Sequence, residues 1–134
     1  MTAIETVRAY IAAVETFDEA AAFALLHPQM RFHELPNRIR PKGGIDDLEA
    51  MRAGFRRAAE GTVLRAQRYI LGEIIDAGDR VVVEARWEGD LVVPVGKLRP
   101  GDQLVAHLCM VFRLEGGLII EQRNYDCYED FTAA

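Results

Sequence analysis

The sequence has few cysteines and no long apolar stretch, and each shortage excludes a class of protein. Cys109 and Cys127 are the only two cysteines in 134 residues, so they can form at most one intramolecular disulfide, and they match no metal-binding spacing. No apolar run approaches the ~20 residues that a membrane-spanning helix needs. The N-terminus also lacks the basic-then-apolar layout of a signal peptide. We therefore expect reduced thiols, a cytoplasmic location and no metal site.

Basic residues are in the minority, because 16 Lys and Arg stand against 21 Asp and Glu, for a net charge of −5. Nucleic-acid-binding proteins typically carry a basic face, so this balance argues against a nucleic-acid partner. Half of the residues are hydrophobic, which is enough for a core in a chain of this length. Repeats, low-complexity tracts and linkers are also lacking, so we expect one domain over residues 1–134.

The start of the chain carries signals for two helices. Thr2 and Glu5 have the spacing of a capping box, and the apolar residues that follow recur at helical spacing. Asp18 is a candidate N-cap for a short second helix over residues 19–26. We expect Pro28 to end that helix, because the residue before a proline is pushed out of helical geometry.

A short strand, a loop and a third helix are expected next. Residues 30–35 have the composition of a strand, and residues 36–44 contain two prolines and two glycines, which is typical of a loop. The third helix is expected to begin near Asp46 and to end at Gly61. Its apolar face would carry Leu48, Met51 and Phe55.

From residue 62 onward the apolar period changes from helical to alternating, which predicts strands. Short segments rich in Gly, Asp and Pro separate these strands, so consecutive strands should run antiparallel. We predict four strands, over residues 63–75, 80–93, 103–114 and 118–127. Helices that cover one face of an antiparallel sheet give an α+β domain.

Alternate side chains of a strand face opposite sides of the sheet, so the apolar set of each strand marks its core face. In the second and third long strands these sets run from Val81 to Trp87 and from Ala106 to Phe112. The other face of the third strand is too apolar for water to be a good cover. We therefore predict a homodimer through this outer face, with contacts from Val105, His107, Cys109 and Val111.

The last strand mixes apolar and polar side chains on one predicted face. Leu118 and Ile120 are expected in the core, and three polar residues continue on the same parity: Gln122, Asn124 and Asp126. In the first strand, Glu34 likewise shares its parity with Phe32. Polar groups on a core face cost free energy unless they are hydrogen-bonded or line a wet cavity. These residues therefore predict a pocket with acid–base capacity.

Several short segments, in their order and spacing, resemble the nuclear transport factor 2-like superfamily, in its SnoaL-like and ketosteroid isomerase-like branch. The segments are Val7-Arg-Ala-Tyr10-Ile-Ala-Ala13, Phe32-His-Glu34-Leu-Pro36, Trp87-Glu-Gly89 and Arg123-Asn-Tyr-Asp-Cys-Tyr-Glu-Asp-Phe131. The resemblance implies three helices packed on a curved, mainly antiparallel sheet that forms a cone around an apolar pocket. It also implies a homodimer through the sheet, but fold alone does not decide function.

The resemblance assigns roles to individual residues. The ketosteroid isomerase pattern places its oxyanion-binding tyrosine on Tyr10 and its general base on Glu34, whereas its second oxyanion donor falls on Met110, which cannot donate. The SnoaL-type and epoxide hydrolase patterns place an acid–base carboxylate on Asp126, or a one-residue slip would bring Cys127 to that position.

From these residues we predict a cofactor-independent acid–base enzyme, an isomerase or polyketide-cyclase-like protein, that acts on an apolar carbonyl compound. Glu34 would be the base, Asp126 its partner and Tyr10 the donor to the enolate-like oxygen. The expected substrate-binding residues are Asn124, Trp87, Met110, Leu108 and Phe55. Two alternatives stay open: activation of water toward an epoxide, and a non-catalytic module for ligand binding or dimer formation.

Overall fold

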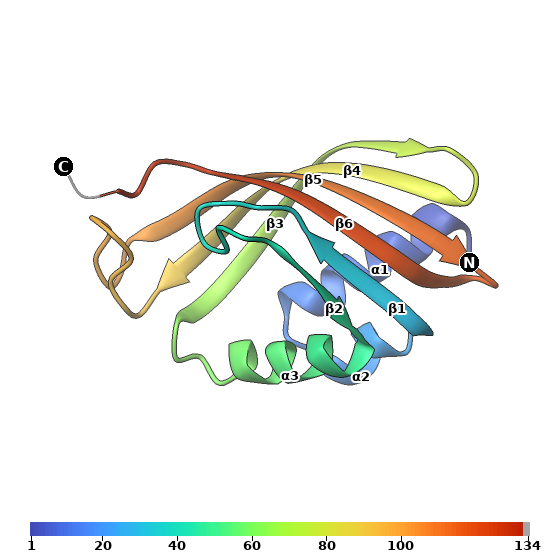
Figure 1. Ribbon diagram of the computed structural model, residues 1–134, viewed down its shortest axis with the longest axis horizontal. Coiled ribbons are helices and arrows are strands. Elements are labelled where there is room, and N and C mark those ends of the chain that lie inside the picture. The colour runs from blue at the N-terminus through green and yellow to red at the C-terminus, as the bar shows by residue number, and fades with distance from the viewer. Residues whose placement is uncertain (133–134) are drawn as a thin grey trace.

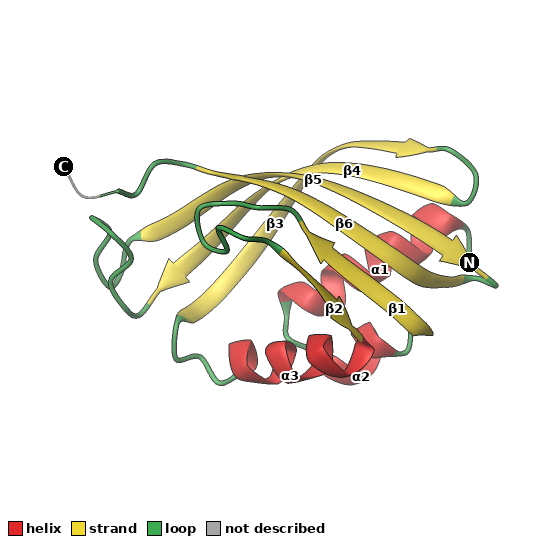
Figure 2. Ribbon diagram, in the orientation of Figure 1, coloured by secondary structure: helices red, strands yellow, loops and turns green. Residues whose placement is uncertain are grey.

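The computed structural model describes residues 1–132. In this range three helices lie against one face of a curved sheet of six strands (Figures 1 and 2). The helices are α1 (Ala3–Glu15), α2 (Glu19–Phe23) and α3 (Leu48–Ala59). The strands are β1 (Leu26–Glu34), β2 (Gly44–Asp47), β3 (Leu64–Asp76), β4 (Arg80–Leu91), β5 (Gln103–Glu115) and β6 (Leu118–Tyr128).

The sheet has the strand order β2-β1-β6-β5-β4-β3. The four long strands β3 to β6 form an antiparallel meander, as their short connections predicted. β1 then runs parallel to β6, and β2 completes the edge antiparallel to β1. The predicted α+β class, with helices on a curved and mainly antiparallel sheet that forms a cone, is confirmed.

The capping box predicted for the first helix is present. The Thr2 hydroxyl accepts a hydrogen bond from the Glu5 backbone N–H, and the Glu5 carboxylate accepts one from the Thr2 N–H, each at 3.1 Å. Two N–H groups that a helix start leaves unpaired are thereby satisfied. One face of α1 is buried against the sheet through Val7, Tyr10 and Ile11.

The second helix is shorter than predicted. Asp18 caps it, accepting from the Ala21 N–H at 3.1 Å, but it ends at Phe23 and not near Pro28. The chain leaves helical geometry earlier because β1 pairs with β6 from Leu26 onward. Pro28 lies inside β1, where a register shift interrupts the pairing, so its missing N–H costs no ladder hydrogen bond.

The strand β2 is a difference from the sequence-based expectation, because its four residues have the composition of a loop and of a helix start. Gly43, at φ +61°, turns the chain back tightly against the end of β1. This lets Gly44 pair with Glu34 and Asp47 pair with Arg31. Asp47, one residue later than expected, is the N-cap of α3 and accepts from the Ala50 N–H at 2.8 Å.

A β-bulge in β6 corrects the expected placement of two apolar residues. Arg113 pairs with Glu121, but Leu114 pairs with Ile119, so Ile120 is an extra residue on β6. Ile119 therefore faces the core cluster and is fully buried, whereas Leu118 is only half-buried. Ile120 is buried as expected, although it lies outside that cluster. Beyond the bulge, the polar residues of β6 face the helices as predicted.

Candidate functional site

A cavity of about 580 Å³ lies between α1, α3 and the concave face of the sheet. Its volume is within the usual range for small-molecule sites. α3 forms one wall without burying any of its own residues, because Met51 and Phe55 border this space. The lining residues are Tyr10, Ile11, Val14, Phe32, Arg40, Asp46, Ala50, Met51, Ala53, Gly54, Phe55, Arg57, Tyr69, Met110, Gln122 and Asn124.

A row of polar side chains on β6 forms the floor of this cavity and continues beyond it. The Gln122 amide donates to the Asn124 Oδ1 at 2.8 Å, and the Asn124 amide donates to the Asp126 Oδ1 at 3.2 Å. Gln122 and Asn124 are buried. Each buried amide therefore has a hydrogen-bond partner, which offsets the free-energy cost of placing it on a core face.

Asp126 is the carboxyl group of this row. Its partner across the ladder is Leu108, a core-face residue, whereas Cys127 pairs with His107 and is exposed. The pKa of Asp126 is raised to about 6, because burial and, to a smaller extent, the negative charge of Glu34 raise it more than the hydrogen bond from Asn124 lowers it. Asp126 can therefore gain or lose a proton near neutral pH.

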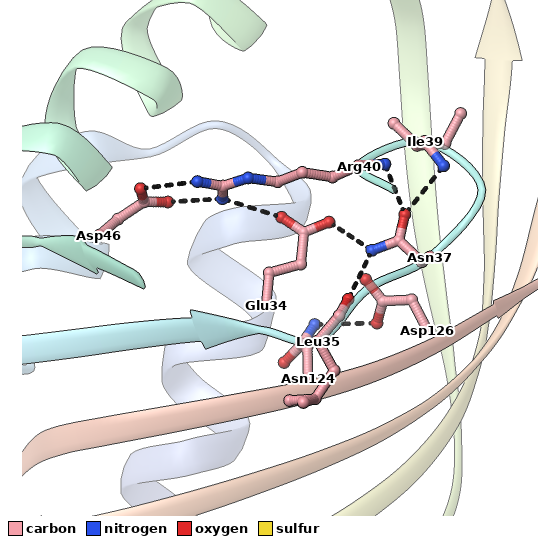
Figure 3. Close-up of polar contacts among 8 residues, drawn as sticks. All are labelled: Glu34, Leu35, Asn37, Ile39, Arg40, Asp46, Asn124 and Asp126. Atoms are coloured by element: carbon pink, nitrogen blue, oxygen red, sulfur yellow. Dashed lines mark hydrogen bonds and ion pairs between the residues drawn. The ribbon is translucent and has the colours of Figure 1, made fainter. Parts of the chain in front are cut away.

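Glu34 lies close to Asp126 but has different partners (Figure 3). One of its oxygens accepts from the Asn37 amide at 2.8 Å, and the other accepts from the Arg40 guanidinium at 3.3 Å. Arg40 also donates twice to Asp46 on β2, at 3.1 and 3.2 Å. Glu34 is thus one end of an ion-pair cluster at the rim of the cavity.

The loop after β1 is shaped so that Arg40 reaches both carboxylates. The Asn37 side-chain oxygen accepts from the backbone N–H groups of Ile39 and Arg40, each at 2.9 Å. This side-chain turn holds the loop compact. The Arg40 guanidinium then lies across Gly44, where any side chain would collide with it.

Two tyrosines, Tyr10 and Tyr69, also line the cavity. Tyr10 packs edge-on against Phe112, with ring centroids 6.2 Å apart. Burial raises the pKa of Tyr10, so its hydroxyl stays protonated and can donate a hydrogen bond. Burial also raises the pKa of Tyr69, and the nearby Tyr10 and Asp126 add to that effect. The cavity therefore presents two protonated phenols and the Asn124 amide, which is hydrogen-bonded to Asp126.

The sequence matches a known domain family. Residues 7–122 match the SnoaL-like domain family. The chain belongs to this family.

Solved structures share the fold of this SnoaL-like chain. IdmH, described as a candidate polyketide cyclase from Streptomyces antibioticus, is 17% identical, with a TM-score of 0.75 over 92% of this chain and 90% of its own. A nuclear transport factor 2-like protein from Burkholderia thailandensis is 24% identical, with a TM-score of 0.73 over 94% and 91%. AclR, a candidate hydroxylase from Streptomyces galilaeus, is 13% identical, with a TM-score of 0.72 over 92% and 77%. A search of curated proteins gives no match.

Four of the predicted site residues line the cavity of this SnoaL-like domain, namely Tyr10, Phe55, Met110 and Asn124. Asp126 is linked to them through its hydrogen bond with Asn124, and Glu34 lies beside Asp126. The structure thus brings both predicted carboxylates and the predicted phenol to one region.

Trp87 and Leu108 do not line the cavity, although the structure describes both. The Trp87 indole lies across Gly89, donates to the Gln67 side chain at 2.9 Å and packs edge-on against Tyr128. Leu108 is buried in the core cluster. These two residues therefore do not border the space that the other four line, although Leu108 is the ladder partner of Asp126.

Sequence reasoning assigned no site role to Tyr69, Gln122 or Asp46. Tyr69 stands opposite Trp87 in the β3–β4 pair, but a register shift in β3 hides this from a count of residues. Gln122 was placed on the inward face without a function. Asp46 reaches Arg40 only because β2 forms, which no local signal indicated.

Neither a metal cluster nor a membrane-spanning helix accompanies this site in residues 1–132. In that range no three His, Cys, Asp or Glu residues are grouped so that they could hold a metal ion. Among the same described residues, no helix has the length and apolar character needed to cross a membrane.

Proposed function

We propose that this protein binds an apolar, carbonyl-bearing small molecule in its cavity and catalyses proton transfer on it, as an isomerase or polyketide-cyclase-like enzyme. Membership of the SnoaL-like family and the similarity to IdmH support a small-molecule function. One observation carries the catalytic part: Asp126 is hydrogen-bonded to the cavity-lining Asn124 and has a pKa near 6. General bases work best when their pKa lies near the operating pH.

The contacts favour Asp126 as the base, whereas the sequence assigned that role to Glu34. Glu34 already accepts from the cation of Arg40 and the amide of Asn37. Asp126 has a neutral amide as its partner, and its pKa is raised to about 6. Glu34 then acts as the neighbouring negative charge that raises the pKa of Asp126.

In the proposed reaction, the Asp126 carboxylate takes a proton from the carbon beside the substrate carbonyl, and the electron pair of that C–H bond forms an enolate. The Tyr10 hydroxyl donates a hydrogen bond to the enolate oxygen. Protonated Asp126 then returns the proton to a different carbon, which gives an isomer. In the cyclase variant, the enolate carbon attacks a second carbonyl and the new alkoxide takes the proton.

The test offers β,γ-unsaturated ketones, polyketide-like aldol substrates and small epoxides to the protein and to its Asp126→Asn variant. We expect turnover of a carbonyl substrate that rises with pH through about 6, and a loss of roughly 10²–10⁴-fold in Asp126→Asn. Tyr10→Phe should lose less, and Asp130→Asn, which alters an exposed carboxylate, should match wild type. Equal turnover by wild type and Asp126→Asn would remove Asp126 from the chemistry. Ligand binding without any turnover would favour a non-catalytic binding module.

Epoxide hydrolysis is the second candidate, and the proximity of two unlike carboxyl groups favours it. In this reaction ionised Glu34, held by Arg40, would take a proton from water while the water oxygen attacks the epoxide carbon. Protonated Asp126 would give its proton to the epoxide oxygen as the ring opens. Turnover of epoxides that falls as pH rises through about 6 would select this reaction over the first.

We also propose a homodimer through the outer face of the sheet. Ile70, Ile75 and Tyr125 are apolar side chains of that face and are 48%, 47% and 41% exposed. Val105, an expected contact, is already buried within the chain, and His107 is paired with Glu129 at 2.9 Å. The exposed apolar side chains of this face therefore lie on β3 and β6, and Glu84 and Arg86 of β4 lie between them.

Light scattering at micromolar concentration tests the dimer. We expect twice the 15.0 kDa mass of one chain, and we expect Ile70→Glu to reduce it to one chain because a charge in an apolar interface is costly. Ile39→Glu, which changes an exposed residue of the loop after β1, is the control. A wild-type mass of one chain would contradict the proposal.

A further inference from the structure

The charged side chains around the cavity are not all neutralised. Arg40, Asp46 and Arg57 are the charged residues among those that line it. Arg40 is paired with Asp46 and Glu34. Arg57 lies on α3 and makes no ion pair or side-chain hydrogen bond within the described part of the chain, residues 1–132. The cavity therefore has one guanidinium at its edge that is free to bind an anion.

The neighbouring arginines of α3 behave differently. Arg52 and Arg56 both donate to Glu19 of α2, and Arg56 does so twice, at 2.7 and 3.0 Å. Arg52 also stacks over the ring of Phe23, with its guanidinium carbon 4.5 Å from the ring centroid. These two residues join α3 to α2. Arg57 takes no part in that contact, so helix docking does not account for its position.

Arg57 lies against Gly54 at the wall of the cavity. Side chains of a helix point toward its N-terminus, so Arg57 leans back over the residue three positions earlier. That residue is Gly54, and its absent Cβ would lie 3.6 Å from the Arg57 Nη2. Gly54 and Arg57 both line the cavity. The guanidinium is thus folded along the cavity wall and does not extend away from the helix.

We infer that the ligand of this cavity is an apolar carboxylic acid whose carboxylate binds Arg57. This inference rests on the proposed small-molecule function and narrows its substrate class to an apolar oxo acid. The guanidinium presents a planar pair of N–H donors that matches a carboxylate. The apolar body of the acid would lie against Met51, Phe55 and Met110, and its carbonyl would reach Tyr10 and the Asn124–Asp126 pair.

Binding of matched acids and esters tests this inference without requiring turnover. The probes are octanoate, 4-phenylbutanoate and 2-naphthylacetate, each with its methyl ester, and affinity is measured by calorimetry on the full chain. We expect wild type to bind at least one acid about tenfold or more tightly than its ester, because a charge-assisted pair forms only with the acid. Raising the salt concentration should reduce this preference.

Two variants of adjacent residues locate the effect. Arg57→Gln should lose most of the preference for the acid and keep the affinity for the ester. Arg56→Gln, which removes a cation of the same helix that pairs with Glu19, should keep the preference. Equal affinity of wild type for acid and ester, or equal loss in both variants, overturns the inference and leaves the proposed function standing. If wild type binds neither acids nor esters, the small-molecule function fails together with the inference.

Discussion

The carboxylates of Glu34 and Asp126 lie close together, but two regions of the molecule surround them with different partners. The loop after β1 surrounds Glu34 with the cation of Arg40 and the amide of Asn37. The strand β6 presents Asp126 with only an amide from Asn124, and burial raises its pKa to about 6. The difference teaches that burial and neighbouring charge, and not the residue type, set the pKa of Asp126.

We expect the largest effect on stability from removing the Asn124 amide of β6. Asn124→Leu leaves the Gln122 amide and the Asp126 carboxyl without their partner on a buried face. Unpaired buried polar groups are costly, so we expect a loss of about 2–4 kcal/mol in the free energy of unfolding. Denaturant titration measures this loss.

The matched variant on the loop side is Asn37→Leu. Its amide also donates to a carboxylate, and its oxygen accepts from the Ile39 and Arg40 N–H groups, but the loop is partly open to water, which can replace these partners. We expect a loss of about 1 kcal/mol. Equal losses in the two variants would mean that the strand amides are no more important for stability than those of the loop.

The next effect concerns the pH dependence of stability. The folded protein raises the pKa of Asp126 from 3.8 to about 6, so the folded state binds more protons than the unfolded state between these values. The contribution of Asp126 to stability therefore falls as the pH rises through this window. Asp126→Asn has no such loss, and relative to wild type it should gain about 1–3 kcal/mol between pH 4 and pH 7.

Thermal unfolding of both proteins across that pH range checks the gain. Asp130→Asn is the control, because the pKa of this exposed carboxyl is lowered by hydrogen bonds from Thr132. Its variant should therefore show no gain at neutral pH. A constant stability difference between Asp126→Asn and wild type from pH 4 to pH 7 would contradict the raised pKa.

The smallest effect concerns the influence of one carboxylate on the other. Glu34→Gln removes a negative charge beside Asp126, so the pKa of Asp126 should fall below 6. It should stay above the ordinary value of 3.8, because burial is the larger cause of the shift. Carbon-detected NMR titration of the Asp126 carboxyl measures this change. Arg38→Gln, on the same loop but paired with Asp130, should leave the titration unchanged, and an unchanged pKa in Glu34→Gln would show that the two carboxylates act independently.

Local sequence signals predicted the parts of this fold that depend on nearby residues. The capping box of Thr2 and Glu5 and the alternating pattern of β4 and β5 needed no knowledge of distant segments. The strand β2 could not be predicted in this way, because its four residues are held by pairing with β1. The end of α2 was missed for the same reason, since β1 begins where Leu26 meets β6.

The candidate site likewise combines features that local sequence signals predicted with features that depend on distant contacts. Tyr10, Asn124 and the inward direction of Asp126 followed from spacing and resemblance. The partners that distinguish Glu34 from Asp126 did not follow, because Arg40 reaches Glu34 and Asp46 only when the loop folds around Asn37. The different partners of the two carboxylates are therefore a property of tertiary contacts.

The extra residue of β6 bears on how chains of this kind tolerate changes in length. Losing Ile120 would straighten the strand and still leave Ile119 and Gln122 on the same side, because the bulge adds a residue that has no partner on β5. Losing a residue between Gln122 and Asp126 would instead turn the rest of the strand over. Insertions and deletions should therefore accumulate at position 120 among related chains. An alignment that counts residues from the start of the strand then slips by one toward its end, and confuses Asp126, which faces the helices, with Cys127, which is exposed.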